Sequence, residues 1–360
     1  MAKELKEELG VLETNTADAV RLIALGIDTE RYLIQFSYLW ECPYTAQELN
    51  MRKVNFASRQ GKSEQVTLFA PLHRELHRDY LKLLKGDKAY NEDALLLNDA
   101  FCGIFDGATG LTNSAPVMSN YPSDAAWFVE ESKQYLELHL QDTSQTIQQL
   151  CQKAMAVCRS RWKGAISVDA IPSAGFAAVR QNGTVLECFC LGDVSLSVRL
   201  LSGAFLYFPE QELSLLDETA LQAAIAYRKE GHSWANAVTH IRPLLQKHRR
   251  MRNQPGGYSA LDLRGHWLNA RTVNLPFSQI RSIFLCSDGF AQLINFGIAK
   301  DLSDLHRRTE QEGVKSLLSL LTQAQQTDQN CVKVPRFKRM DDATAAILQS
   351  KDCSTLQSLL

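Results

Sequence analysis

Four short acidic segments each lie where an apolar run ends or a turn begins. They are Asn91–Asp93, Phe105–Gly107, Ser287–Gly289 and Asp341–Asp342. An Asp that follows an apolar run is held at the rim of a core. A Gly after it lets the backbone turn sharply with its carbonyl group free. Carboxylate and carbonyl oxygens are the ligands that hard divalent cations prefer.

These segments allow two interpretations. Taken singly, each is typical of a turn, because Asp-Gly and Asn-Glu pairs are common turn residues. If the chain brings them together, their carboxylates repel one another and raise one another's pKa, unless a divalent cation lies between them. Convergence of the four segments would therefore imply a site for Mg²⁺ or Mn²⁺.

Composition excludes several other classes of protein. Lys and Arg number 39 against 40 for Asp and Glu, so the net charge of −1 gives no general attraction to nucleic acid or to a membrane. No apolar stretch is long enough to span a bilayer, and the sequence begins without an apolar signal segment. The nine Cys have no regular spacing. We expect a reduced, cytoplasmic chain with no membrane partner.

The acidic segments must be positioned by strands and helices, and both patterns are present. Apolar alternation and turn residues, including the tight turn Asn182-Gly183, predict an antiparallel meander. The predicted strands are 101–105, 175–180, 184–191, 195–201, 204–208 and 343–348, and the predicted helical stretches are 124–162, 217–252 and 302–324. Strands grouped with strands, and helices inserted in blocks, favour an α+β fold.

The first 80 residues have a different pattern. Apolar residues at three-and-four spacing predict a helical N-terminal segment, 1–80, with a second domain at 81–350. The segment could be a regulatory or docking element with its own partner, or a layer packed on the domain. DNA binding there is unlikely, because no dense basic stripe follows the helices. The loop 253–257 reads as a linker. The basic run 247–252 is interpreted as a solvated helix end in preference to a phosphopeptide-docking patch.

Five segments, in this order, resemble the signature of the metal-dependent protein phosphatase 2C family, also called PPM, in its bacterial form. They are Lys85–Asp93, Phe101–Gly110, Cys190–Ser195, Ile283–Phe290 and Met340–Leu348. The resemblance covers about residues 84–348 and leaves the N-terminal segment outside. It implies a four-layer α-β-β-α sandwich of two antiparallel sheets flanked by helices, here with a helical N-terminal extension.

The resemblance also implies a metal centre with two Mg²⁺ or Mn²⁺ ions. Asp106 would bridge the ions, Gly107 would offer its carbonyl oxygen, and Asp288 and Asp341 would complete one metal. Asp341 is preferred to its neighbour because it aligns with the first residue of the family's Asp-Asn motif. Metal-bound waters would be held by Glu92 and Asp93.

Three positions depart from the family pattern. Lys88 stands where many members grip the phosphate with Arg, and it offers a point charge in place of a bidentate fork. Ala108 replaces a His that is thought to protonate the leaving oxygen in eukaryotic members. Gln292 replaces an Asp that binds a third ion together with the residue matching Asp193, so a third ion is doubtful.

The leading hypothesis is therefore a signalling phosphatase that hydrolyses phosphoserine or phosphothreonine in proteins through a metal-bridging hydroxide. An alternative is a catalytically weak or inactive phosphatase-like module that binds and regulates a protein partner. A third possibility keeps the fold and the metals but changes the substrate to a small phosphoester or another modified protein.

Overall fold

The chain divides into two units, Met1–His73 and Arg74–Leu360. The computed structural model describes residues 20–28, 33–40, 76–84, 90–98, 100–110, 115–209 and 211–350. In the first unit, β1 (Val20–Asp28) and β2 (Leu33–Trp40) form an antiparallel pair. The predicted helical N-terminal segment is therefore wrong for these residues.

Apolar residues that recur at every second position explain these two strands. Ile34, Phe36 and Tyr38 recur at every second residue, and β-branched and aromatic residues favour strands. β3 (Leu76–Leu84) pairs with β13 of the second unit, which places the division after His73, earlier than residue 80. The remainder of 1–80 lies outside the described residues.

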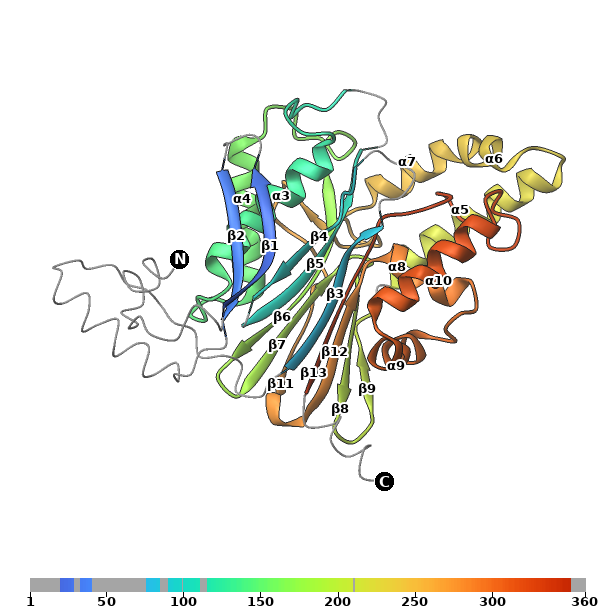
Figure 1. Cartoon of the computed structure of the whole chain (residues 1–360). Coiled ribbons are helices and arrows are strands. Elements are labelled where there is room, and N and C mark those ends of the chain that lie inside the picture. The colour runs from blue at the N-terminus through green and yellow to red at the C-terminus, as the bar shows by residue number, and fades with distance from the viewer. Residues whose placement is uncertain are drawn as a thin grey trace, which may run out of the picture. The chain divides into compact units, whose positions relative to one another are not determined.

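The second unit contains two antiparallel sheets (Figure 1). The first sheet has the order β11-β7-β6-β5-β4, with β10 paired to β6. Its strands are β4 (Ala94–Leu97), β5 (Phe101–Ala108), β6 (Ser173–Asn182), β7 (Val185–Leu191), β10 (Leu261–Asp262) and β11 (Arg271–Pro276). The second sheet has the order β3-β13-β12-β8-β9. Its other strands are β8 (Ser195–Leu200), β9 (Phe205–Tyr207), β12 (Ile280–Cys286) and β13 (Ala343–Ser350).

Helices cover the outer faces of both sheets (Figure 1). On the first sheet lie α3 (Asp124–His139) and α4 (Ile147–Arg161), and on the second lie α8 (Asp288–Asn295), α9 (Leu302–Glu312) and α10 (Val314–Thr327). A further group is α5 (Gln211–Lys229), α6 (Trp234–His240) and α7 (Arg242–Arg250), and the 3-10 turn η1 (Phe277–Gln279) precedes β12.

Three cores separate the layers. One lies between α3, α4 and the first sheet, one between the two sheets, and one between the second sheet and α8–α10. Alternation divides β5 between two of them, because Phe105 faces the helices and Ile104 faces the other sheet. The predicted four-layer α+β sandwich is confirmed. No helix in the described part of the chain is long and apolar enough to cross a bilayer.

The long predicted helical stretches are each broken by a recognisable signal. Thr146 and Gln149 form a capping box that starts α4. Pro243 lies in the first turn of α7, and Gly313, with φ of 79°, separates α9 from α10. The predicted hairpin at Asn182-Gly183 is confirmed by the β6–β7 pairing.

The predicted linker at 253–257 is a packed turn. A Cβ atom on Gly257 would lie 1.9 Å from the carbonyl oxygen of Met251. The buried Asn253 side chain bonds to Ala260 and Asp262. This turn therefore belongs to the folded unit and does not divide it.

Candidate metal centre

Strand pairing brings the acidic segments to one edge of both sheets. In the first sheet, Asp106 at the end of β5 lies opposite Gly175 of β6. In the second sheet, Cys286 pairs with Ser195 on one side and Ala345 on the other. The segments just beyond these residues carry the remaining carboxylates, so the register itself makes the acidic segments converge.

Three carboxylates meet there. One ligand oxygen from each of Asp106, Asp193 and Asp288 lies within 4.8 Å of the others. The backbone N–H of Asp288 lies 3.4 Å from Oδ2 of Asp106. Because all these donors are oxygen atoms, the group suits Mg²⁺ or Mn²⁺ better than a softer metal.

The electrostatics of the cluster are those of like charges held together. Burial, then Asp288 and Asp93, raise the pKa of Asp106 well above its ordinary range. Burial and Asp193 likewise raise the pKa of Asp288. Burial and Asp288 raise the pKa of Asp341, although Lys338 opposes them. Cationic charge added to this cluster would therefore be stabilised.

Glu92 and Asp93 lie just behind the cluster and are buried. The Glu92 carboxylate accepts hydrogen bonds from the hydroxyls of Ser123, at 2.6 Å, and Thr109. Its backbone N–H donates to Oδ2 of Asp342 at 2.8 Å. Ser123 also caps α3, so this helix start fixes the Glu92 side chain.

Asp93 is less well satisfied. Its Oδ2 atom has no hydrogen-bond partner among the described residues. Burial raises its pKa to about 8, although the hydroxyls of Thr344 and Ser287 lower it. A buried carboxyl oxygen without a donor is costly unless a cation or an ordered water completes it.

Two glycines allow the backbone to approach closely. A Cβ atom on Gly107 would lie 2.5 Å from the carbonyl oxygen of Glu92. On Gly289 it would lie 1.9 Å from the carbonyl oxygen of Asp342. No side chain fits at either position, so these two Asp-Gly pairs hold acidic segments against each other.

One acidic residue of the candidate site was not predicted from the sequence. Asp217, on α5, lines a hollow of about 200 Å³ together with Asp106 and Asp193. Burial and Asp288 raise the pKa of Asp217 to about 6, and burial and Asp217 raise that of Asp193 to about 6. Asp193 therefore belongs to the cluster. Gln292 does not belong to it, and its amide oxygen instead accepts a hydrogen bond from Gln325.

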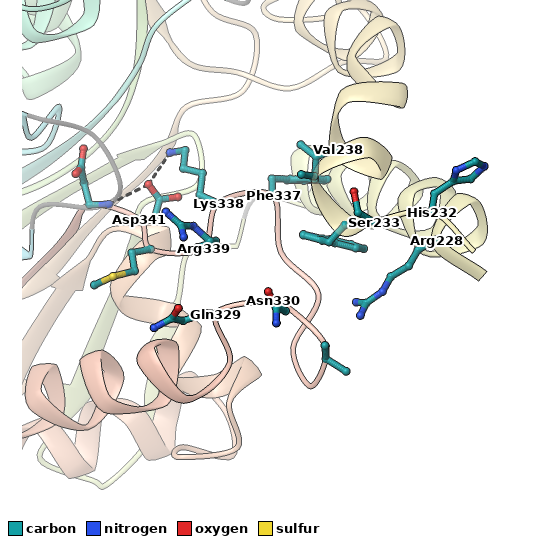
Figure 2. Close-up of a pocket in the computed structure, with 15 residues that line it drawn as sticks. Arg228, His232, Ser233, Val238, Gln329, Asn330, Phe337, Lys338, Arg339 and Asp341 are labelled. Atoms are coloured by element: carbon teal, nitrogen blue, oxygen red, sulfur yellow. Dashed lines mark hydrogen bonds and ion pairs between the residues drawn. The ribbon is translucent and has the colours of Figure 1, made fainter. Parts of the chain in front are cut away.

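Lys338 was also missed, and it lies against a predicted metal ligand. Its Nζ atom is 2.5 Å from Oδ1 of Asp341 (Figure 2). Burial lowers its pKa, but Asp341 and Asp288 more than offset this effect, so the ammonium stays charged. The spacing of three residues between the two was the available signal. Lys88, the predicted phosphate-binding residue, lies outside the described residues.

The basic run 247–252 is only partly a solvated helix end. Arg249 points into the site and donates to the carbonyl oxygens of Ala108, at 3.2 Å, and Thr109, at 2.8 Å. Arg252 is buried and pairs with Asp262 at 3.0 Å. The solvated interpretation is therefore wrong for these two residues, because tertiary contacts replace water around them.

No protein-family model matches the sequence, and no curated protein sequence matches it. Several solved structures to which this chain is similar are serine/threonine phosphatases. The phosphatase MsPP of Mycobacterium smegmatis is 13% identical with a TM-score of 0.42, covering 78% of this chain and 99% of its own. Stp1 of Staphylococcus aureus is 12% identical with a TM-score of 0.41, covering 80% and 98%. The catalytic domain of PstP, solved with two manganese ions, is 13% identical with a TM-score of 0.40, covering 76% and 97%.

Proposed function

We propose that this chain is a Mg²⁺- or Mn²⁺-dependent phosphatase that hydrolyses phosphoserine or phosphothreonine in proteins. The observation that supports it is the convergence of Asp106, Asp193 and Asp288, whose ligand oxygens lie within 4.8 Å of one another. Burial and the neighbouring carboxylates raise the pKa values of these three groups, so a bound divalent cation would stabilise them.

The residues present fit two divalent cations. Asp106, Asp193 and Asp288 would supply carboxylate oxygens. Asp341, which is not one of that group of three, would supply a further carboxylate oxygen, and Gly107 would supply its carbonyl oxygen. Such ions, when bound, lower the pKa of a shared water and stabilise the charge that develops on a phosphoryl group. The remaining steps belong to the chain's own side chains.

Those side chains position the substrate and the ligands. Glu92, whose carboxylate is fixed by Ser123 and Thr109, would hold ordered water at the centre. The Arg249 guanidinium lines the hollow beside Asp106 and offers a cation to the phosphate. Ala108 cannot donate a proton, so we expect phosphoserine and phosphothreonine, whose alkyl leaving groups are poor, to be hydrolysed more slowly than aryl phosphates.

A second candidate function is a weak or inactive module that binds a protein partner. The ion pair of Lys338 with Asp341 favours it, because the ammonium neutralises a carboxylate that a metal would use. The two functions differ in one respect that can be measured directly. A phosphatase turns over with Mn²⁺, whereas the module binds its partner without turnover.

The test is hydrolysis by the purified full chain of p-nitrophenyl phosphate and of a phosphothreonine peptide. Each substrate is assayed with Mn²⁺, with Mg²⁺ and with EDTA. We expect metal-dependent release of phosphate from both, with the aryl substrate less sensitive to the missing acid at Ala108. Folded protein that releases no phosphate from either substrate would contradict the proposal and favour the module.

A further inference from the structure

A groove of about 770 Å³ lies beside the metal centre, between α6 and the segment 329–342 (Figure 2). Trp234 and Val238 line it from α6, and Phe337 and Val332 line it from the opposite segment. Val332 is 59% exposed, so its side chain is accessible from solvent. The groove therefore offers apolar surface to a ligand.

Both walls of the groove are fixed. The indole Nε1 of Trp234 donates to the carbonyl oxygen of Arg336 at 2.8 Å. The Arg228 guanidinium donates to the carbonyl oxygen of Cys331 at 2.9 Å and lies over the Trp234 ring. These bonds join α5 and α6 to the facing segment. The groove is thus formed before any ligand binds, which reduces the entropy cost of binding.

The inner end of the groove reaches the metal centre. Asp341 and Asp342 line it, and Asp341 is electrostatically coupled to Asp288 within the acidic cluster. A residue that reacts at the cluster therefore has its neighbours in the polypeptide beside this groove. Small phosphoesters have no atoms that could reach it.

The groove is basic as well as apolar. Arg228 and Arg339 line it together with Trp234 and Phe337. The acidic residues that line it lie at the metal end, where bound cations would neutralise them. Charge and surface type together complement a ligand with acidic and apolar side chains.

We propose that this groove binds the part of a phosphoprotein substrate that flanks the phosphorylated residue, and that it selects flanks carrying acidic and apolar side chains. This inference rests on the proposed phosphatase function and adds to it a substrate class. It predicts that peptide binding and chemistry at the metal centre can be separated by substitutions in the groove.

Two substitutions test the groove, each with a matched control. Val332→Glu places a negative charge on its apolar wall, and Leu138→Glu makes the same change on α3 at a side chain that is 78% exposed. Arg339→Glu reverses a charge in the groove. Its control, Lys315→Glu, reverses the charge of an exposed lysine at the start of α10, the end of that helix remote from the groove. If Arg339→Glu fails to fold, Val332→Glu still decides.

Binding is measured by fluorescence anisotropy with Mn²⁺ present and with two labelled, unphosphorylated peptides, so that the acidic end of the groove carries its cations and turnover does not contribute. One peptide carries Phe and Glu residues around a Thr, and the other carries Ala and Lys there. We expect the acidic peptide to bind about tenfold more tightly, and each groove variant to lose about tenfold in affinity for it. Both controls should bind like the unmodified chain.

Equal affinity for both peptides, or groove variants that bind like their controls, would overturn the proposal. Turnover of p-nitrophenyl phosphate with Mn²⁺ is measured on the same proteins and should be unchanged by Val332→Glu and by both controls. Loss of this turnover in the unmodified chain would contradict the phosphatase function itself, and the anisotropy result would still report on the groove.

Discussion

Asp328 and Asp341 lie on the same connection between α10 and β13, yet their surroundings are opposite. The Asp328 carboxylate accepts hydrogen bonds from the backbone N–H groups of 332–334 at 2.8–3.1 Å and from Arg336 at 2.9 Å. Its pKa falls to about 2, because these donors outweigh the effect of burial. Burial and Asp288 instead raise the pKa of Asp341.

The difference separates a structural carboxylate from one that we propose to be functional. Asp328 is satisfied by the chain itself and holds one wall of the groove in place. Burial and neighbouring carboxylates raise the pKa values of Asp106, Asp288 and Asp341, and we propose that bound cations complete them. The following four changes would break or sharpen this comparison.

The largest effect is expected for Asp106→Asn. It keeps the shape of the side chain but removes a charge shared by the whole cluster, so Mn²⁺-dependent turnover of p-nitrophenyl phosphate should fall by about 10³-fold or more. The metal-free variant should melt at or above the temperature of the unmodified chain, because one repelling charge is lost. Turnover equal to that of the unmodified chain would mean that Asp106 is not a metal ligand.

Asp328→Ala should show the opposite behaviour. It leaves Arg336 buried without its carboxylate, which typically costs about 3–5 kcal/mol of unfolding free energy. Urea denaturation measures this loss. Asp169→Ala removes an exposed pair with Arg250 and should cost less than about 1 kcal/mol. A loss for Asp328→Ala no larger than for this control would remove the distinction.

The two kinds of carboxylate also predict opposite pH dependences. The folded pKa of Asp93, about 8, is above its unfolded value, so the stability it contributes is lost as pH rises through 8. The folded pKa of Asp328, about 2, is below its unfolded value, so its contribution is lost as pH falls from about 4 to about 2.

Thermal melts of metal-free protein between pH 6 and pH 9 test the first prediction. The melting temperature should fall across this range, and Asp93→Asn should flatten the curve. A melting temperature that rises steadily towards pH 9 would show that the cluster does not retain protons in the folded state.

The smallest effect is expected for Lys338→Met. The ammonium pairs with Asp341, so a divalent cation must compete with it, and its removal should raise Mn²⁺ affinity by a few-fold. Lys333→Met, at an exposed lysine on the same connection, is the control. Weaker Mn²⁺ binding by Lys338→Met would mean that the lysine supports the metal centre and does not compete with it.

The sheet region could be predicted because its signals are local. Alternation, the Asn182-Gly183 turn and the Asp-Gly pairs at strand ends each follow from neighbouring residues. The N-terminal strands were misread because Val20–Asp28 carries apolar residues at spacings that suit both a helix and a strand. Pairing with another strand, which the sequence does not display, decides between the two.

The candidate site was predictable where a residue ends a strand and not where it enters from a distant helix. Asp106, Asp288 and Asp341 follow or precede apolar runs, whereas Asp217 and Arg249 lie within helical patterns that look solvated. Their place beside Asp106 depends on how α5 and α7 pack over the sheet edge. The position of Lys338 depends in the same way on the turn that the hydrogen bonds of Asp328 stabilise.

The most direct test of the central claim is calorimetric titration of Mn²⁺ into the full chain, with Asp106→Asn and Asp328→Asn in parallel. We predict that two ions bind to the unmodified chain, that Asp106→Asn loses this binding, and that folded Asp328→Asn retains it. Absence of Mn²⁺ binding, or binding that Asp106→Asn leaves unchanged, would contradict the assignment of these unsatisfied carboxylates as a metal centre.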